Sequence, residues 1–546
     1  MISRALPILL AAAATLAAQP ATVEGRVTNT LDGKPVRKAT VALRGTVRSG
    51  TPPDVDTYLT EAGADGRFKI ENVPPGKYQA LPSHPSFTDR LPDRAADPMI
   101  VTLEPGQHAV VSLQLIPDGV ISGRTVDQEG DPIRAAYVEV LRYSYVSGKR
   151  QLSVVRSAPT NDRGEYRAYG IPPGSYYLRA AVRPGPGTML AFNMPNERIR
   201  GAPPELGFAT TFYPGARDVA QTAPLELKPG AELTNVDIRL QREAVYSVRV
   251  KLPESSPGTP FSGMTLQRRS PEAAPSRGGW VQRMYNGFFE FAGVPPGPYV
   301  LTATHGGTET KGQVQYARHF VEIVDHDVEV PTLDFVPGID VPGAVKVEGT
   351  LPSPLTNLRV LLQSQEPGPG GGNATVDADG AFAIHNVLPE TYQLHVMPVP
   401  RGAYLKSVKL GDRVLPNLEV DLTGGARAIT LVLATDGGRI EGQVLNAEGE
   451  PAPSVRVTLI PDGARADRRK IATSDDKGDY VFQDVAPGDY RLFAWLDADP
   501  GAPQDPEFRK PFEKLSIAVT IEPSSRQTVP LTAITVHNFG DRLRNP

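Results

Sequence analysis

The sequence predicts an all-β fold: a tandem array of five β-sandwich domains after a signal peptide. Its 546 residues are too many for one ordinary core, because a domain usually holds ~100–200 residues. Its 52 glycines, 55 prolines and 40% hydrophobic residues are typical of short strands joined by tight turns. A motif that occurs five times sets the number of domains.

The repeated motif is clearest in "ADGRFKIENVPPGKY", which ends at Tyr78. Related stretches end at four later tyrosines, and in every copy a glycine stands 12 residues before the tyrosine. These glycines follow one another at intervals of 98, 123, 93 and 98 residues, which fits one β-sandwich per copy. The pairs are Gly66 and Tyr78, Gly164 and Tyr176, Gly287 and Tyr299, Gly380 and Tyr392, and Gly478 and Tyr490.

Each motif predicts two strands and two turns. In the first copy Phe68 and Ile70 alternate with polar residues, and Tyr78 resumes the alternation on the next strand, so all three are expected to face one core. Gly66 is expected in a tight turn, and Gly76 is expected to supply the positive φ of a type II turn. The fourth copy reads "PETY" where the first reads "PGKY", so its turn is expected to differ.

A second pattern precedes the motif in three of the five copies. It runs from Val23 ("VEGRVTNTLDGKPVRKATVAL"), from Ile121 and from Ile440, and it predicts a strand, a Gly-x-Pro turn and another strand. The third and fourth copies are degenerate here. Several domains then close on an alternating segment such as "AVVSLQLIP", which we expect to be the final strand.

These patterns predict the domain organisation. Short linkers between the domains favour a semi-rigid rod. The predicted parts are a signal peptide (1–18), sandwich one (19–116), sandwich two (117–242) with a long loop at about 183–224, diverged sandwiches three (243–337) and four (338–434), sandwich five (435–535) and a tail (536–546).

The combined pattern resembles the carboxypeptidase regulatory-like domain family. It comprises the first-strand Gly25, Gly123 and Gly442, the Gly-x-Pro turn and the repeated tyrosine motif, and it is similar also to the transthyretin-like, Cna B-type and starch-binding-like relatives. The resemblance implies antiparallel Greek-key β-sandwiches of roughly seven or eight strands, of immunoglobulin-like or prealbumin-like type. It also implies an exported bacterial protein without peptidase activity, because the regulatory domain is the part of those enzymes that lacks the zinc site. No lysine and asparagine recur at matching positions, which argues against the crosslink of Cna B-type domains.

The N-terminus predicts export. Arg4 precedes an apolar run from Ala5 to Ala18, which is typical of a signal peptide cleaved near Ala17 or Ala18; a retained membrane anchor is the alternative. We expect the mature protein in the periplasm, on the cell surface or outside the cell, with no transmembrane segment after cleavage. The 57 basic and 61 acidic side chains create no net field that would attract nucleic acid.

The sequence shows no catalytic pattern. The absence of cysteine excludes disulfides, thiolate catalysis and cysteine-ligated metals. The eight histidines form no zinc-binding spacing, and no nucleophile elbow, Walker loop or dinucleotide fingerprint occurs. We therefore predict a non-enzyme with no catalytic, cofactor-binding or metal-binding residues, which acts as a structural, adhesive or scaffold protein at the bacterial envelope.

Carbohydrate binding is the alternative function. It needs an exposed aromatic platform that stacks on a sugar ring. The candidate ligand-binding residues are Trp280 and Tyr285 in "GGWVQRMYNG", and Phe212 and Tyr213 in the long loop of the second sandwich. The same aromatic residues could instead pack within or between domains. The expected partner is therefore a polysaccharide or an envelope protein.

Overall fold

The structure is a computed structural model of the whole chain. The residues that it describes are 19–45, 57–89, 99–146, 149–182, 205–251, 261–269, 281–285, 288–305, 314–352, 355, 357–364, 371–499 and 501–536. The predicted signal peptide, 1–18, lies outside these ranges, as does nearly all of the predicted tail.

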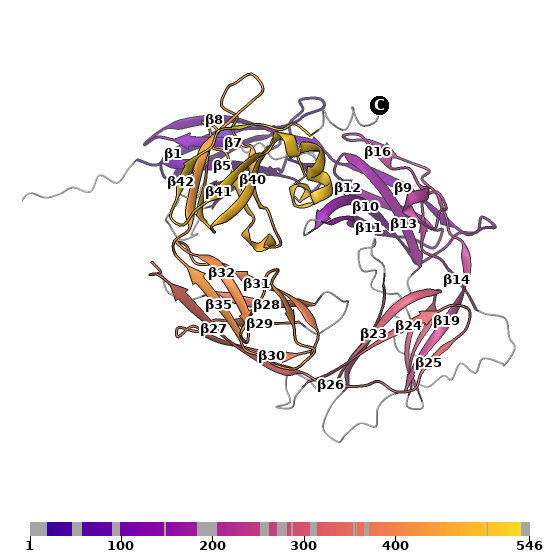
Figure 1. Ribbon diagram of the computed structural model, residues 1–546. Helices are drawn as coiled ribbons and strands as arrows, with labels where there is room; N and C mark the ends of the chain where they lie inside the picture. Colours follow the sequence, from indigo (N-terminus) through magenta and orange to yellow (C-terminus); the bar gives the residue numbers. More distant parts are fainter. Residues whose placement is uncertain are drawn as a thin grey trace, which may run out of the picture.

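Ten sheets, paired face to face, form five β-sandwiches in the described part of the chain (Figure 1). Each pair encloses its own cluster of buried hydrophobic residues. The predicted all-β sandwich fold is confirmed. One core ends and the next begins near residues 118, 241, 338 and 436, and we propose these as the domain boundaries.

The first two sandwiches contain β1–β13 and β15–β18. The first consists of sheets β4-β1-β8-β6 and β3-β2-β5-β7; the second of β12-β9-β17, with β18 also on β9, and β11-β10-β13-β15, with β16 on β13. Their elements are β1 (Ala21–Asn29), β2 (Thr40–Gly45), β3 (Thr57–Glu61), β4 (Arg67–Val73), β5 (Gly76–Ser83), β6 (Phe87–Thr88), β7 (Met99–Leu103), β8 (His108–Pro117), β9 (Gly119–Val126), β10 (Ala136–Val146), β11 (Lys149–Pro159), β12 (Glu165–Ile171), β13 (Gly174–Val182), β15 (Thr211–Phe212), η2 (Val219–Gln221), β16 (Leu225–Leu227), β17 (Glu232–Leu233) and β18 (Ile238–Arg239).

The third and fourth sandwiches contain β14 and β19–β35. The third consists of sheets β14-β19-β22-β21, with β25 on β19, and β20-β23-β24-β26; the fourth of β30-β27-β35-β32-β33 and β29-β28-β31-β34. Their strands are β14 (Glu205–Phe208), β19 (Arg242–Lys251), β20 (Phe261–Arg268), β21 (Val281–Tyr285), β22 (Phe288–Val294), β23 (Gly297–His305), β24 (Gln315–Ile323), β25 (Val328–Val330), β26 (Val336–Pro337), β27 (Ile339–Glu348), β28 (Arg359–Ser364), β29 (Gly372–Thr375), β30 (Ala381–Val387), β31 (Thr391–Met397), β32 (Tyr404–Leu410), β33 (Arg413–Val414), β34 (Glu419–Asp421) and β35 (Ile429–Ala434).

The fifth sandwich adds short helices to its two sheets, β39-β36-β42, with β43 on β36, and β38-β37-β40-β41. Its elements are β36 (Gly438–Leu445), β37 (Arg456–Pro461), η3 (Ala466–Arg468), β38 (Lys470–Thr473), β39 (Asp479–Val485), β40 (Gly488–Trp495), η4 (Ala502–Gln504), α1 (Pro506–Arg509), η5 (Lys510–Leu515), β41 (Ile517–Ile521), β42 (Arg526–Thr528) and β43 (Leu531–Thr532). No helix in the described ranges is long and apolar enough to span a membrane.

The five sandwiches share one strand order around their first strand. In the first sandwich β1 pairs antiparallel with the motif strand β4 and parallel with the closing strand β8. The same two pairings recur around β9, β19, β27 and β36. Each such sheet is therefore mixed, because its closing strand runs parallel to the first one.

The motif tyrosine has the same role in all five copies. Its ring is buried, and its hydroxyl donates a hydrogen bond to the backbone carbonyl four residues earlier, which closes the turn between the two motif strands. A buried tyrosine hydroxyl needs such a partner. The bonds run from Tyr78 to Pro74 (2.8 Å), Tyr176 to Pro172 (2.6 Å), Tyr299 to Pro295 (2.9 Å), Tyr392 to Leu388 (2.5 Å) and Tyr490 to Ala486 (2.7 Å).

The left-handed residue lies before the turn between the two motif strands, and not within that turn as the sequence predicted. Gly76 does not have a left-handed φ, so the type II turn predicted there is wrong, although the equivalent glycines of the second, third and fifth copies have φ of 155°, 141° and 146°. A left-handed residue occurs instead six positions after the motif glycine in each copy, at a β-bulge where the register with the first strand shifts. These bulge residues are Asn72 (φ 58°), Gly170 (66°), Gly293 (77°), Asn386 (56°) and Asp484 (53°).

A glycine in the first strand makes room for the aromatic residue of the motif. Gly25, Gly123, Gly343 and Gly442 lie opposite Phe68, Tyr166, Phe382 and Tyr480 in register. A Cβ at Gly343 would lie 2.1 Å from the Phe382 ring, and a Cβ at Gly25 would lie 2.0 Å from the Val111 carbonyl oxygen. The sequence pattern had identified three of these glycines; Gly343 is the fourth. The third sandwich has Val250 in this position, opposite Phe289.

We predict that Gly343→Ala destabilises the fourth sandwich by about 1–3 kcal/mol, because the added methyl group overpacks the core against Phe382. Faster hydrogen exchange in β27 and β30 of the full chain would show this. Gly424→Ala is the control: it lies in the same sandwich without a left-handed φ, and its nearest neighbour would be 3.9 Å away. Equal exchange rates in the two variants would contradict the prediction.

The five sandwiches form a closed ring rather than the predicted rod (Figure 1). The fifth sandwich returns to the first and second, where Lys77 forms an ion pair with Asp476 (2.9 Å). The rings of Tyr145 and Phe508 also meet there, with their centroids 5.8 Å apart. The linkers are short, but the chain bends at its junctions, so the fifth sandwich meets the first and second (Figure 1).

Candidate interdomain interface

The four residues predicted to bind carbohydrate do not form one platform. Trp280 lies outside the described residues, and Tyr285 ends β21, where only the backbone is described. In the second sandwich Phe212 and Tyr213 are half-buried, and they pack against two different hydrophobic clusters. Carbohydrate binding through these residues stays a prediction.

Phe212 and Tyr213 attach the end of the long loop to its own sandwich. Phe212 belongs to the cluster of Leu141, Leu152 and Val219 on the outer face of the sheet that contains β10. Tyr213 packs against the inner core and donates its backbone N–H to the Leu178 carbonyl (3.0 Å). This arrangement agrees with the alternative interpretation of the two residues, in which they pack the loop onto its own domain.

The described residues contain no group of three or more histidines, aspartates and glutamates that could hold a metal ion. Hydrogen bonds or ion pairs instead cross each place where one sandwich meets the next. These four junctions, and the contact that closes the ring, make up the candidate site.

The junction between sandwiches one and two is held by backbone hydrogen bonds. Asp118 donates its N–H to the Ser86 carbonyl (3.0 Å), and Gly230 donates to the Pro117 carbonyl (2.9 Å). The Asp118 side chain is half-buried, and its Oδ1 has no hydrogen-bond partner among the described residues. Burial raises the pKa of Asp118 to about 6, and Arg156 opposes this shift.

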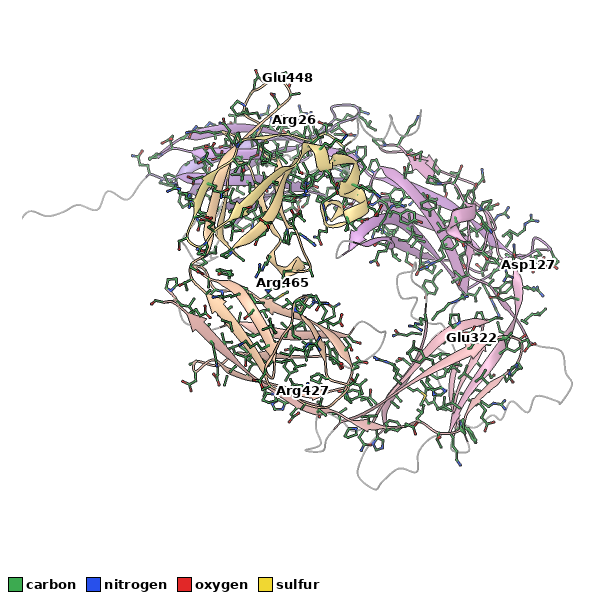
Figure 2. The ribbon with its side chains drawn as sticks, in the orientation of Figure 1. Arg26, Asp127, Glu322, Arg427, Glu448 and Arg465 are labelled. Atoms are coloured by element: carbon green, nitrogen blue, oxygen red, sulfur yellow. The ribbon has the colours of Figure 1, made fainter. Side chains whose placement is uncertain are left out.

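Between sandwiches two and three, one strand that follows the second sandwich in the chain joins a sheet of the third. Strand β14 follows the second sandwich's β13 in the chain but pairs with β19 of the third sandwich. Two ion pairs flank this exchange: Arg242 with Asp127 (2.9 Å), and Arg217 with Glu243 (2.8 Å). Figure 2 shows Asp127 at this junction. The long loop of the second sandwich therefore serves partly as an interdomain connector.

Between sandwiches three and four, the unusual turn of the fourth motif forms the contact. Glu390 occupies the position of Gly76 in the first copy, and its carboxylate pairs with Arg318 of the third sandwich. Ser364 also donates to Glu390 (2.7 Å). Beside them the Tyr316 hydroxyl donates to the carbonyl of the bulge residue Asn386 (3.0 Å). Both side chains of the ion pair are largely buried, at 12% and 17% exposed.

Between sandwiches four and five, another bulge residue reaches back. Asp484 accepts a hydrogen bond from the Gly402 N–H (2.9 Å). The Tyr404 hydroxyl donates to Asp436 (2.8 Å), and burial together with Asp436 raises the pKa of Tyr404. Arg465 donates to the Leu405 carbonyl (2.9 Å), and Figure 2 shows it between these two sandwiches.

Three of the four junctions, all except the one between sandwiches two and three, share one geometric device. The bulge residues Asn386 and Asp484 each contact the preceding sandwich, and Gly170 lies beside the Pro85 carbonyl of the first. Motif analysis placed these residues in the repeat but did not assign them a role. A signal was available, because asparagine and aspartate are the residues that most readily replace glycine at left-handed φ and also offer a side chain for contacts.

We predict that Asp118→Asn stabilises the first junction at pH 7.5, stabilises it less at pH 4.5 and has little effect below the ordinary aspartate pKa of 3.8. A carboxyl group with a raised pKa favours the folded state below its ordinary pKa, and this contribution is lost as the pH rises through about 6. The melting temperature of variant and wild type should therefore diverge as the pH rises. Asp412→Asn, at an exposed turn of the fourth sandwich, is the control. A pH-independent difference for Asp118→Asn would contradict the assignment.

We predict that Glu390→Gly loosens the third junction while the fourth sandwich keeps its fold. The change restores the glycine of the other copies but leaves Arg318 without its carboxylate, and breaking a largely buried pair typically costs about 3–5 kcal/mol. Faster hydrogen exchange at residues 314–318 is the expected result, with exchange in β31 unchanged. Glu348→Ala removes an exposed ion pair with Lys406 and should have little effect. Loss of protection throughout the fourth sandwich would show that Glu390 acts within it instead.

The family model of the carboxypeptidase regulatory-like domain matches residues 22–115 and 439–504, which are the first sandwich and most of the fifth. The human BOS complex subunit NOMO2 is 23% identical over 487 residues, which cover 86% of this chain and 34% of that protein. The mouse BOS complex subunit NOMO1 is also 23% identical, over 86% of this chain and 35% of its own length. The chain thus spans about a third of the length of the curated relatives that it matches.

Two solved structures match this chain at low identity and low overall similarity. The Bacillus anthracis TIE protein is 9% identical, with 93% of this chain and 72% of that chain covered and a TM-score of 0.16. BcpA, the major pilin subunit of Bacillus cereus, is 9% identical, with 94% and 99% covered and a TM-score of 0.15.

Proposed function

Because its first and fifth sandwiches are carboxypeptidase regulatory-like domains, we propose that this protein is a non-catalytic scaffold that binds another protein. The observation that carries the proposal is the set of junctions. Each of the four is fixed by hydrogen bonds or ion pairs beyond the chain itself. Such contacts restrict the angles between successive sandwiches, and a frame of restricted flexibility is useful for positioning a partner.

The relatives agree with a role in an assembly. The human and mouse relatives are named as subunits of the BOS complex, and they match this chain over 86% of its length. We further propose that the protein acts after export, at the bacterial envelope. The predicted leader in 1–18 and the lack of cysteine in the chain motivate this location.

Purification of the tagged protein from the envelope fraction tests the scaffold function. We predict that a protein partner co-purifies at fixed stoichiometry, and that Glu390→Gly weakens this association although the partner does not contact Glu390, because the frame has become flexible. Glu348→Ala is the matched control and should retain the partner.

Two results would contradict the proposal. One is binding of the pure protein to a polysaccharide that is lost in Phe212→Ala or Trp280→Ala, which would favour the carbohydrate-binding alternative. The other is peptidase activity that a chelator abolishes.

A further inference from the structure

We propose that the contact which closes the ring is a reversible clasp, so that the chain can change between a closed ring and an open chain. The clasp has two parts. One is the segment 496–499 and 501–516 of the fifth sandwich, which we call the strap. The other is the tip of the β10–β11 hairpin of the second sandwich.

The strap is a fixed part of the fifth sandwich. It contains η4, α1 and η5, and it covers the outer face of the sheet β38-β37-β40-β41. Trp495 lies beneath it, 1% exposed, between Phe493, Phe508 and Phe512, and its indole N–H donates to the Thr458 hydroxyl (2.9 Å). This second hydrophobic cluster keeps the strap folded whether or not the ring is closed.

The strands of this hairpin are longer than the corresponding strands of the other sandwiches. Strands β10 and β11 have eleven residues each, whereas β20 has eight and β2, β28 and β37 have six. Pairing between β10 and β13 ends at Leu141, so the rest of the hairpin projects beyond the sheet. Arg150 covers the Tyr143 ring at 3.8 Å and Tyr145 lies opposite Arg150, which stiffens the projecting part.

The strap and the hairpin meet closely. The Phe508 ring contacts the Tyr145 ring edge-to-face, with the centroids 5.8 Å apart. A Cβ at Gly501 would lie 2.3 Å from the Tyr145 carbonyl oxygen, so the strap backbone packs directly on the hairpin. Burial at this contact raises the pKa of the Tyr145 hydroxyl; Arg150 opposes the shift, and Asp505 and Asp499 of the strap add to it.

The closing contact is weaker in kind than the four junctions. Within the described ranges, no backbone hydrogen bond joins the fifth sandwich to the first or second. The chain also does not link them directly, whereas it links each pair of successive sandwiches. Its ion pair, Lys77 with Asp476, is about half exposed on both sides. Such pairs contribute little and are screened by salt. Closure therefore depends on the aromatic contact, aided by the high effective concentration of two sites in one chain.

Distance measurements on the full chain test the clasp, and the absence of cysteine makes site-specific labelling straightforward. Labels at Val154→Cys and Ile471→Cys, both at exposed positions, would report the distance between sandwiches two and five. The expected result is one short distance for the wild-type background. Phe508→Ala and Tyr145→Ala should each add a long-distance population, raising the open fraction roughly tenfold.

The two variants change opposite sides of the contact, so Tyr145→Ala tests the clasp even if Phe508→Ala disturbs the strap. Phe320→Ala is the control: it removes an exposed phenylalanine from the third sandwich and should leave the distance unchanged. An unchanged distance distribution in both Phe508→Ala and Tyr145→Ala would overturn the proposal.

A crosslink provides the second test. With Lys77→Cys and Asp476→Cys as the only two cysteines of the chain, a bifunctional thiol-reactive crosslinker should join them within one molecule, and it should do so less readily when Phe508→Ala is added. Crosslinks formed only between two molecules would show that these surfaces join separate copies, and would overturn the intramolecular clasp.

Discussion

The hydrogen bond from the motif tyrosine to the carbonyl four residues earlier is the constraint on which each sandwich, and then each junction, depends. It closes the turn between the two motif strands while the tyrosine ring fills the core. The bulge residue stands just before this turn, at the end of the sandwich where the chain enters. In the second, fourth and fifth sandwiches, this bond therefore also presents the bulge residue to the preceding sandwich.

Departures from the repeat supply the contacts between sandwiches. Glu390 replaces the glycine that the other four copies have at this position of the turn, and the gained carboxylate pairs with Arg318 across a junction. The insertion in the second sandwich supplies β14 to the third. The strap occurs after the last motif and reaches the second sandwich. The repeated residues thus build the domains, and the residues that differ connect them.

Much of the fold could be predicted from local patterns. Alternation identified Phe68, Ile70 and Tyr78 as core residues, and all three are buried. The first-strand glycines were identified by recurrence, although their purpose, space for an aromatic ring, needed the register of two strands. The left-handed position was misplaced at Gly76, because proline and glycine favour a turn there without fixing which residue takes positive φ.

The sequence by itself determined the number of sandwiches, their strands and their cores, because side-chain alternation and turn residues act over a few neighbouring positions. Only the tertiary structure decided how the sandwiches are arranged. Arg318 and Glu390 are 72 residues apart and Tyr145 and Phe508 are farther still, and neither pair leaves a periodic trace in the chain. Such contacts depend on the angles at the junctions, and these angles arise from the packing of whole surfaces.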